Sequence, residues 1–361
     1  MKLFVFGSSL VSSYWNGAAT YYRGIYKHLA RLGHDITFAE PDAYQRQSHR
    51  DDGDFSYARS IVYCSPEDID ALLREAAGAD LVIKHSGVGV DDALLEKRVL
   101  ECRSATTFVA FWDVDAPATL ARVEHNESDP FRALIPQYDF VFTYGGGPPV
   151  VEHYRRRGAR NCNPIYNGLD PATHLPVLPD ADLHCDLALV ANRLPDRERR
   201  IEEFFLRAAE LAPEMTFILG GEGWGMKRLP ANVRWIGHVR TADHNRVNCS
   251  ARMVLNVNRD SMADVGFSPP TRIFEAAGAG ACLITDAWTG IEEFFTPGKE
   301  ILVAASAEAV VRHLRETAPE CARSIGQAMR QRALAGHTYD RRAREVESVL
   351  ASIRAVAEVA G

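Results

Sequence analysis

The sequence lacks several features that would place it in a special class of protein. Its seven cysteines are odd in number and form no C-x-x-C pair, which argues against a disulfide framework or a cysteine zinc site. No apolar run approaches the length of a membrane span, and the first run, residues 3–6, is too short for a signal peptide. A net charge of -7 argues against broad nucleic-acid binding. These absences favour a cytoplasmic protein without a transmembrane segment and leave peripheral membrane contact open.

Two α/β domains are the architecture that the rest of the composition favours. A chain of 361 residues with 46% hydrophobic residues can build two cores. Short apolar strands alternate with helical segments in both halves, which is typical of doubly wound sheets. Residues 164–179 contain four prolines and little periodicity. We predict a first domain at residues 1–165, a linker at 166–180 and a second domain at 181–361, the two domains facing a central cleft.

Polar loops follow several predicted strands of the first half. Strands are predicted at residues 3–6, 35–39, 61–63, 79–84, 106–111 and 140–143, and helices at 20–32, 66–77 and 91–102. The loops at residues 84–89, 112–117 and 144–149 come directly after strands. Because parallel strands end at the same edge of a sheet, we expect these loops to lie at one edge.

The stretch from Ser268 to Asp286 has the clearest local pattern of the second half. Two prolines predict the start of a helix, Gly278 and Gly280 predict its end, and a short apolar strand follows. Arg272 and Glu275 are expected near the first turns of this helix, beside the carboxyl end of a strand. Open α/β sheets bind phosphorylated ligands at such places. The alternative is an ordinary helix with a surface ion pair.

Two motifs of the second half resemble a known family. The segment I-Y-N-G-L-D, ending at Asp170, looks like the N-G-x-D linker of GT-B glycosyltransferases, and the block R-I-F-E-A around Glu275 looks like the branch related to spore maturation protein CgeB. The resemblance implies a GT-B fold of two Rossmann-like domains. It also implies a nucleotide-sugar donor in the second domain, used as a co-substrate without a metal or another cofactor.

The resemblance assigns the donor-binding residues. The glutamate of the R-x-F-E-A block bonds the ribose in such enzymes, which implies that role for Glu275, with Arg272 beside it. A basic pair after the first strand of the second domain usually holds the diphosphate, and Arg193 and Arg197 stand at that place. Guanidinium groups match phosphate oxygens and neutralise a leaving group. The alternative is a solvated basic helix, since Arg199 and Arg200 follow.

Two further segments resemble parts of the family's nucleotide site. Glu222 and Gly223 lie in a glycine-rich turn, where small residues let a backbone approach a nucleotide, although such a turn can also be only a turn. His238 follows a predicted strand that often contacts the base, and a structural role for it is equally open. The position eight residues before Glu275 is a further glutamate in many retaining members, but here it is Phe267. This departure leaves the transferred sugar and the stereochemistry open.

The first half offers His85 and Asp113 as catalytic candidates. Both follow predicted strands at the expected cleft edge, where a base can accept the acceptor's proton. Asp115 shares an extended face with Asp113, and we expect it to cap a helix that begins at Ala116. The D-x-D spacing also invites a metal reading, which the two-domain resemblance argues against, so no metal ligand is assigned.

A glycosyltransferase is the function that these features favour. It would transfer a sugar from a nucleotide-sugar donor to a glycan, a lipid or a small metabolite, without a metal, and the basic pair slightly favours retention. One alternative is a nucleotide-sugar epimerase or a phosphorylase of the same plan. Another is a catalytically silent sugar-nucleotide-binding partner of a different transferase.

Overall fold

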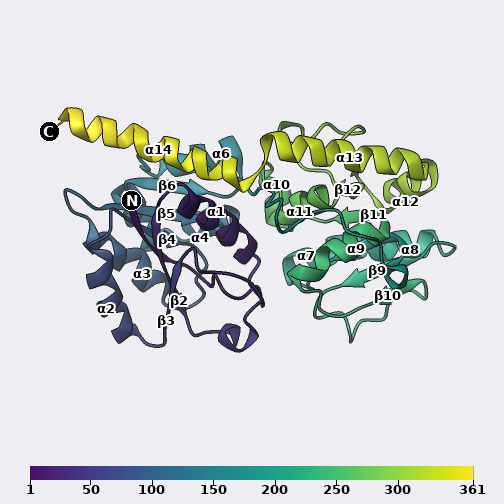
Figure 1. Cartoon of the computed structure of the whole chain (residues 1–361), viewed down its shortest axis with the longest axis horizontal. Coiled ribbons are helices and arrows are strands. Elements are labelled where there is room, and N and C mark those ends of the chain that lie inside the picture. Colours follow the sequence, from purple (N-terminus) through teal and green to yellow (C-terminus); the bar gives the residue numbers. More distant parts are fainter. Residues whose placement is uncertain (361) are drawn as a thin grey trace. The chain divides into compact units, whose positions relative to one another are not determined.

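The chain folds into two compact units, seen in a computed structural model that describes residues 1–360, with side chains as far as residue 351 (Figure 1). The first unit contains Met1–Asn167 and Tyr339–Gly361, and the second contains Gly168–Thr338. The first crossing thus falls inside the predicted N-G-x-D motif. The predicted limits differ from this division in two ways: residues 168–180 belong to the second unit, and the last helix belongs to the first.

The first unit is built on a seven-stranded sheet with the order β3-β2-β1-β4-β5-β6-β7, and all of its strand pairs are parallel. β1, the predicted first strand, lies in the middle with Val5 and Phe6 fully buried. A parallel sheet covered on both faces requires such continuous apolar strands. The strands are β1 (Lys2–Phe6), β2 (Asp35–Pro41), β3 (Arg59–Tyr63), β4 (Leu81–His85), β5 (Phe108–Asp113), β6 (Phe140–Thr143) and β7 (Cys162–Pro164).

Helices from both ends of the chain share one core of the first unit. Tyr22 of α1 and Val346 of α14 belong to the same buried cluster as the strands. Gly24 lets the two helices approach closely, since a Cβ atom there would lie 2.3 Å from the ring of Tyr339. The helices are α1 (Ala19–Arg31), α2 (Pro66–Ala76), α3 (Asp92–Arg98), α4 (Ala116–His125), α5 (Phe131–Leu134), α6 (Gly147–Arg156) and α14 (Tyr339–Ala360).

The second unit repeats the plan with six parallel strands in the order β10-β9-β8-β11-β12-β13. One face of the sheet packs on the helices between Ile201 and Ala209 and on α12, and the other face packs on Val247 of α9. The strands are β8 (Cys185–Val190), β9 (Phe217–Gly220), β10 (Val233–Trp235), β11 (Ala251–Asn256), β12 (Leu283–Asp286) and β13 (Leu302–Ala304). The helices are α7 (Pro195–Ile201), α8 (Arg207–Leu211), α9 (His244–Ser250), α10 (Asp260–Val265), α11 (Thr271–Ala279), α12 (Ala307–Glu316) and α13 (Pro319–Gly336).

Local sequence explains most helix limits and one departure from the prediction. Ser65 and Asp68 form a capping box at the start of α2, and Gly280 ends α11 with φ of 72°. α6 begins inside the predicted loop at residues 144–149, because Gly146 turns with φ of 85° and proline stands in the first turn. A π-helical turn, Glu202–Leu206, lies between α7 and α8.

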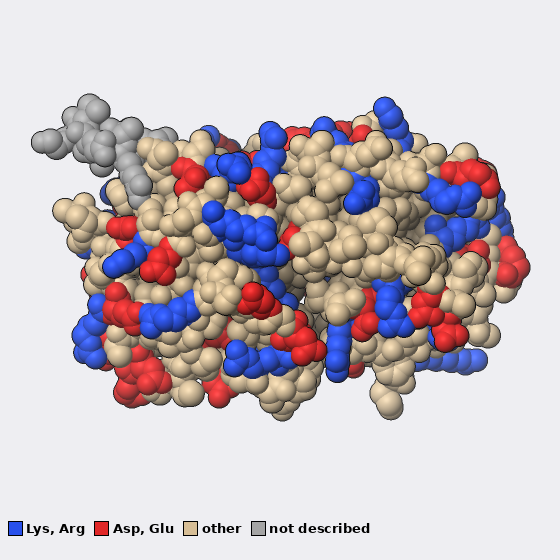
Figure 2. Space-filling model, in the orientation of Figure 1, with Lys and Arg blue, Asp and Glu red and all other residues tan. Residues whose placement is uncertain are grey.

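The surface shown in Figure 2 mixes Lys and Arg with Asp and Glu over both units, with no patch of one sign across the view. This agrees with the modest net charge of -7. Within the described residues no helix combines the length and hydropathy that crossing a bilayer requires.

Each sheet has one point where the strand order reverses. In the first unit it lies between β1 and β4, and in the second it lies between β8 and β11. Ligands of doubly wound folds bind outside the carboxyl ends of the strands at such a point. Ligands are therefore expected at the loops of residues 7–18 and 86–91 in the first unit and of residues 191–194 and 257–259 in the second.

Candidate active site

The loops at the reversal point of the second sheet present two asparagines. Asn192 follows β8, and its Oδ1 atom accepts a hydrogen bond of 3.0 Å from the backbone N–H of Glu222. Asn258 follows β11 and is only 2% exposed, yet its Nδ2 atom has no hydrogen-bond partner in the described structure. A buried donor without a partner is costly, which makes the amide of Asn258 a candidate ligand group.

Glu275 lies in the middle of α11 and is 4% exposed. Its Oε2 atom is 3.2 Å from Nδ1 of His244 and 3.8 Å from Nη2 of Arg272, but it makes no hydrogen bond of good geometry. Burial by itself would raise the pKa of Glu275. The nearby charges of His244 and Arg272 outweigh burial and hold that pKa well below its ordinary value. The group is therefore a buried carboxylate that keeps its charge and still has room to accept hydrogen bonds.

Two histidines lie beside this carboxylate. His174 is 3% exposed, and neither of its ring nitrogens has a hydrogen-bond partner in the described structure. Its ring stacks on that of His244, with centroids 6.2 Å apart. Burial lowers the pKa of His174, so its imidazole is neutral at pH 7 and can donate one hydrogen bond and accept another. Neither His174 nor His244 is among the residues that the sequence indicated.

Three arginines surround the same edge of the sheet. Arg197 donates to the carbonyl oxygen of Asn192 at 2.9 Å, and burial, with the charge of Arg272 nearby, lowers its pKa to about 10. Burial also lowers the pKa of Arg272, whose Nη1 atom has no hydrogen-bond partner among the described residues. Arg259 is the third, and its charge likewise lowers the pKa of Arg197. The partly buried positive charges of Arg197 and Arg272 favour the binding of an anion, whereas Arg259 is ion-paired with Asp196.

Arg193 is engaged with acidic neighbours. Its Nη2 atom is 2.8 Å from Oε1 of Glu198, which lies 2.7 Å from Nζ of Lys227. Hydrogen bonds from Arg193 and Lys227 lower the pKa of Glu198 to about 2. Arg193, predicted to bind phosphate, is thus held in a partly exposed ion-pair network, whereas Arg272 lies 3.8 Å from Glu275 and its charge acts on Arg197.

The glycine-rich turn is tied to the loop after β8. A Cβ atom on Gly221, which has φ of +117°, would lie 2.3 Å from the carbonyl oxygen of Ala191, so only glycine fits there. The backbone N–H of Arg193 donates to the carbonyl of Glu222 at 2.9 Å, and Gly223 packs on the Cβ atom of Arg193. The turn therefore shapes the loop that carries Arg193. His238 lies on an exposed loop after β10.

The segment before α11 is strained at Phe267. This residue has φ of +47°, which is unfavourable for a bulky side chain, and its N–H donates to the carbonyl of Thr289 at 2.7 Å. Its ring occupies the space that a Cβ atom on Gly290 would need. Phe267 therefore replaces the glutamate of many retaining enzymes with a packed aromatic ring.

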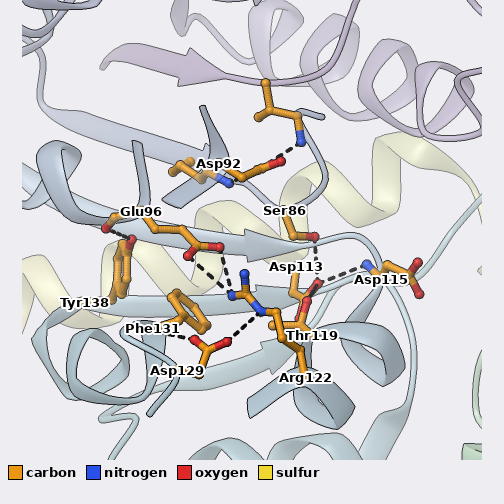
Figure 3. Close-up of polar contacts among 12 residues, drawn as sticks. Ser86, Asp92, Glu96, Asp113, Asp115, Thr119, Arg122, Asp129, Phe131 and Tyr138 are labelled. Carbon is orange, nitrogen blue, oxygen red and sulfur yellow. Dashed lines mark hydrogen bonds and ion pairs between the residues drawn. The ribbon is translucent and has the colours of Figure 1, made fainter. Parts of the chain in front are cut away.

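Asp113 is fully buried in the first unit and surrounded by donors (Figure 3). Oδ1 accepts from Ser86 Oγ at 2.7 Å, from Thr119 Oγ1 at 3.0 Å and from the N–H of Asp115 at 3.0 Å. Oδ2 accepts from the hydroxyl of Tyr154 at 2.6 Å. Burial raises the pKa of Asp113 although these bonds oppose it. The carboxylate joins β4, β5, α4 and α6, which is a structural arrangement and does not favour the predicted base.

Asp115 stands at the N-cap of α4, as expected, but its carboxylate makes no capping hydrogen bond. Asp113 instead accepts the N–H of Asp115 and the hydroxyl of Thr119, which ties the start of α4 to the end of β5. Both carboxylate oxygens of Asp113 already accept hydrogen bonds, which argues against Asp113 and Asp115 as a pair of metal ligands.

His85 is also enclosed. It is 1% exposed, its Nε2 atom contacts the hydroxyl of Tyr26, and the rings of Tyr22 and Trp112 pack against it. Burial and the charge of Lys84 lower its pKa well below the ordinary value. A neutral imidazole inside an aromatic cluster does not favour proton transfer with a substrate. The structure thus brings Arg197, Arg272 and Glu275 together and places His85 and Asp113 within the core of the other unit.

Known proteins match this chain in two ways: a sequence family matches part of it, and solved structures match nearly all of its fold. Residues 197–348 match a family model described as glycosyl transferase-like. The chain also matches solved structures along almost its whole length. It has the GT-B fold of glycosyltransferases. The predicted fold class and the predicted resemblance to GT-B glycosyltransferases are thereby confirmed, and the narrower relation to the CgeB branch stays a prediction.

Three solved structures illustrate the likeness. Sucrose-phosphate synthase from Thermosynechococcus elongatus is 15% identical with a TM-score of 0.68, and the alignment covers 99% of this chain and 100% of that one. HepE of Anabaena, solved with UDP and glucose, is 14% identical with a TM-score of 0.69, covering 98% and 100%. An α-glucosyltransferase solved with UDP and a 13-mer DNA is 10% identical with a TM-score of 0.72, covering 97% and 99%. No curated protein sequence matches the chain.

Proposed function

We propose that this protein is a glycosyltransferase that takes a sugar from a nucleoside diphosphate sugar bound in its second unit. The observation that carries the proposal is the group of buried polar atoms without hydrogen-bond partners on Asn258, His174, Glu275 and Arg272. These side chains lie around the reversal point of a doubly wound sheet. Buried polar groups are normally satisfied, so a set of unsatisfied ones at a ligand-binding edge supports a polar ligand there.

The ribose and the diphosphate of a nucleoside diphosphate each have matching groups in the second unit. Glu275 keeps its charge and offers Oε2 as an acceptor, which suits the hydroxyl groups of a ribose. Arg197 and Arg272 supply the positive charge that suits two phosphates. Arg193 can join them when a phosphate competes with Glu198 for its guanidinium group.

The chemistry that we propose does not depend on a base from the first unit. The bond between the anomeric carbon and the diphosphate oxygen breaks, an acceptor hydroxyl oxygen bonds to that carbon, and the hydroxyl proton passes to the departing phosphate. The arginines stabilise the negative charge that develops on the leaving group, which supports transfer without a metal. Because His85 and Asp113 are enclosed and the acceptor can approach beside the leaving group, retention remains the favoured outcome.

Uridine is the base to test first, because HepE and the α-glucosyltransferase were solved with UDP. The measurement is a thermal-shift screen of the full chain against UDP, GDP, dTDP, ADP and their sugars, with nucleotide release assayed in the same samples. A ligand at 100 times its dissociation constant adds about 2.7 kcal/mol, which shifts the midpoint by several degrees. Slow release of one nucleotide from its sugar, unchanged by EDTA, is the expected result. No shift with any nucleotide contradicts the proposal, and release that needs added manganese contradicts its metal-free form.

A further inference from the structure

The first unit presents two exposed aromatic rings near the carboxyl ends of neighbouring strands. Trp15 follows β1 and is 46% exposed, and Tyr44 follows β2 and is 54% exposed. β1 flanks the point where the strand order of this sheet reverses. Large aromatic side chains that stay exposed at a ligand-binding edge are unusual, since most of their stabilising effect comes from burial.

Both residues have an unfavourable backbone conformation. φ is +47° at Trp15, +56° at Tyr44 and +57° at Gln45, in the left-handed region that favours glycine. Holding a bulky residue there costs free energy, and such strain persists where the surroundings impose it, often at binding sites. Neither exposed ring recovers this cost by packing in the core.

A buried arginine fixes the loops that carry the rings. Arg46 is 6% exposed and donates to the carbonyl of Ser8 at 3.1 Å, that of Trp15 at 3.4 Å and that of Val88 at 3.5 Å. Its guanidinium carbon lies 4.9 Å from the centre of the Tyr44 ring. These bonds join the loops that follow β1, β2 and β4. Arg46 therefore ties the two ring-bearing loops together, through the ring of Tyr44 and the backbone carbonyl of Trp15.

Polar and acidic residues accompany the rings in the same loop segments. Tyr14 stacks on His49 with centroids 4.0 Å apart, and its ring also lies edge-on to that of Trp15 at 6.4 Å. The segment from residue 42 to 54 carries four aspartates and two arginines, and Arg46 is buried. Asp51 is engaged by Arg23 at 2.6 Å, and the other three aspartates are exposed. The surroundings are thus hydrophilic and negative, which disfavours the phosphates of a nucleic acid or of an anionic lipid.

We infer that Trp15 and Tyr44 form the acceptor-binding surface of the protein and that its ligand is a neutral glycan. A sugar ring has an apolar C–H face, which suits an aromatic ring, and hydroxyl edges, which suit the polar groups around it. The inference rests on the proposed glycosyltransferase activity. It selects glycans from the three acceptor classes that the sequence left open.

The test measures binding of the full chain to an array of neutral gluco-, galacto-, manno- and N-acetylglucosamine oligosaccharides in the presence of UDP. Wild type should bind at least one series, and Trp15→Ala and Tyr44→Ala should each weaken that binding at least tenfold. The shift in melting midpoint caused by the nucleotide should stay as in wild type. Val62→Ala, which alters another exposed apolar residue of the first unit, is the matched control and should bind as wild type does.

The possible failures are distinguishable. A protein that shows the nucleotide shift but binds no oligosaccharide overturns the glycan inference and leaves the donor proposal standing. Loss of the nucleotide shift as well contradicts the proposed function itself. Binding of single-stranded DNA or of phosphatidylglycerol vesicles through the same two rings also overturns the inference.

Two further variants separate a ligand role from a packing role. Glycine adopts φ of +47° without strain, so Trp15→Gly should keep or raise the melting midpoint while oligosaccharide binding falls at least tenfold. Tyr44→Phe loses the 2.8 Å bond to the carbonyl of Gly89 but keeps the ring, and should retain most of the binding. A lower midpoint with unchanged oligosaccharide binding in Trp15→Gly would assign the ring to packing and refute the inference.

Discussion

Two buried carboxylates, one in each unit, show what distinguishes a structural group from a candidate ligand group. Asp113 and Glu275 are 0% and 4% exposed, and each belongs to an element at the carboxyl edge of its sheet. Asp113 accepts four hydrogen bonds from neighbouring side chains and backbone, whereas Oε2 of Glu275 accepts none of good geometry. At Asp113, burial raises the pKa of the carboxyl group and the hydrogen bonds only partly oppose this rise. At Glu275, the charges of His244 and Arg272 oppose the effect of burial and lower the pKa below its ordinary value.

The comparison teaches that burial of an acidic residue does not by itself indicate catalysis. A carboxylate with all its acceptor positions occupied holds elements together, and its removal exposes unsatisfied donors. A carboxylate with a free acceptor position, kept charged by cations, is prepared for a ligand. The following predictions test this distinction in order of decreasing effect.

Asp113→Ala should produce the largest effect, a loss of about 3–5 kcal/mol in the free energy of unfolding, because it leaves several buried donors without an acceptor. Urea unfolding followed by tryptophan fluorescence measures it. Asp115→Ala is the control, since it removes the neighbouring, less buried carboxylate at the start of the same helix, and it should cost under about 1 kcal/mol. Equal losses in the two variants would remove the structural role from Asp113.

Glu275→Gln should weaken nucleotide binding by about 2–3 kcal/mol, or 30-fold to 150-fold, because the ribose loses a charged acceptor. The free energy of unfolding should fall by about 1–3 kcal/mol, less than in Asp113→Ala, because the variant leaves His244 and Arg272 without their buried anionic partner. Titration calorimetry with UDP measures the first quantity and urea unfolding the second. Glu210→Gln, in a surface ion pair with Arg207 in the same unit, is the matched control. Normal UDP binding by Glu275→Gln would contradict the assigned site.

The two carboxylates should respond to pH with opposite signs. The pKa of Asp113 is raised in the folded protein, so its contribution to stability falls as pH rises from about 3.9 toward the folded pKa. The pKa of Glu275 is lowered, so its contribution is complete above about 4.3 and is lost as pH falls through the folded pKa. Unfolding of wild type against Asp113→Asn and against Glu275→Gln between pH 3 and 6 measures each contribution, at most about 1.4 kcal/mol per pH unit. Slopes of the same sign would refute the comparison.

Glu198→Gln should have the smallest effect and should improve function. Its pKa of about 2 keeps it charged, and it holds Arg193 at 2.8 Å. Partly exposed ion pairs contribute about 0.5 kcal/mol, so freeing Arg193 should strengthen UDP binding about twofold. Glu202→Gln, which removes the other acidic partner of Lys227 and leaves Arg193 paired, is the control for titration calorimetry. Unchanged affinity would show that Arg193 does not reach the diphosphate.

Local patterns predicted a large part of the fold and part of the site. The prolines and glycines around α11 marked both of its ends, and their local effects on φ do not depend on distant residues. The alternation of strands and helices indicated two parallel sheets, which the structure confirms. Arg272 and Glu275 could be found because they are three residues apart on one helix.

Contacts between distant parts of the chain could not be predicted in this way. His244 meets Glu275 from another helix, and Asn258 became notable only because its buried amide has no partner. Asp113 looked catalytic from its place after a strand, but Tyr154, forty-one residues away, completes its hydrogen bonds. The sequence indicates which helix, strand or loop carries a side chain. The hydrogen bonds that the side chain can still make to a ligand depend on the residues packed around it.

The sequence by itself determined the two parallel α/β sheets and the helix that carries Glu275. Only the tertiary structure decided that the last helix returns to the first unit, where Gly24 admits the ring of Tyr339. It also decided that both oxygens of Asp113 accept hydrogen bonds and that Oε2 of Glu275 accepts none of good geometry. The physical reason is that helix and strand limits follow from short-range sterics and hydrogen bonds, whereas saturation and burial are properties of long-range packing.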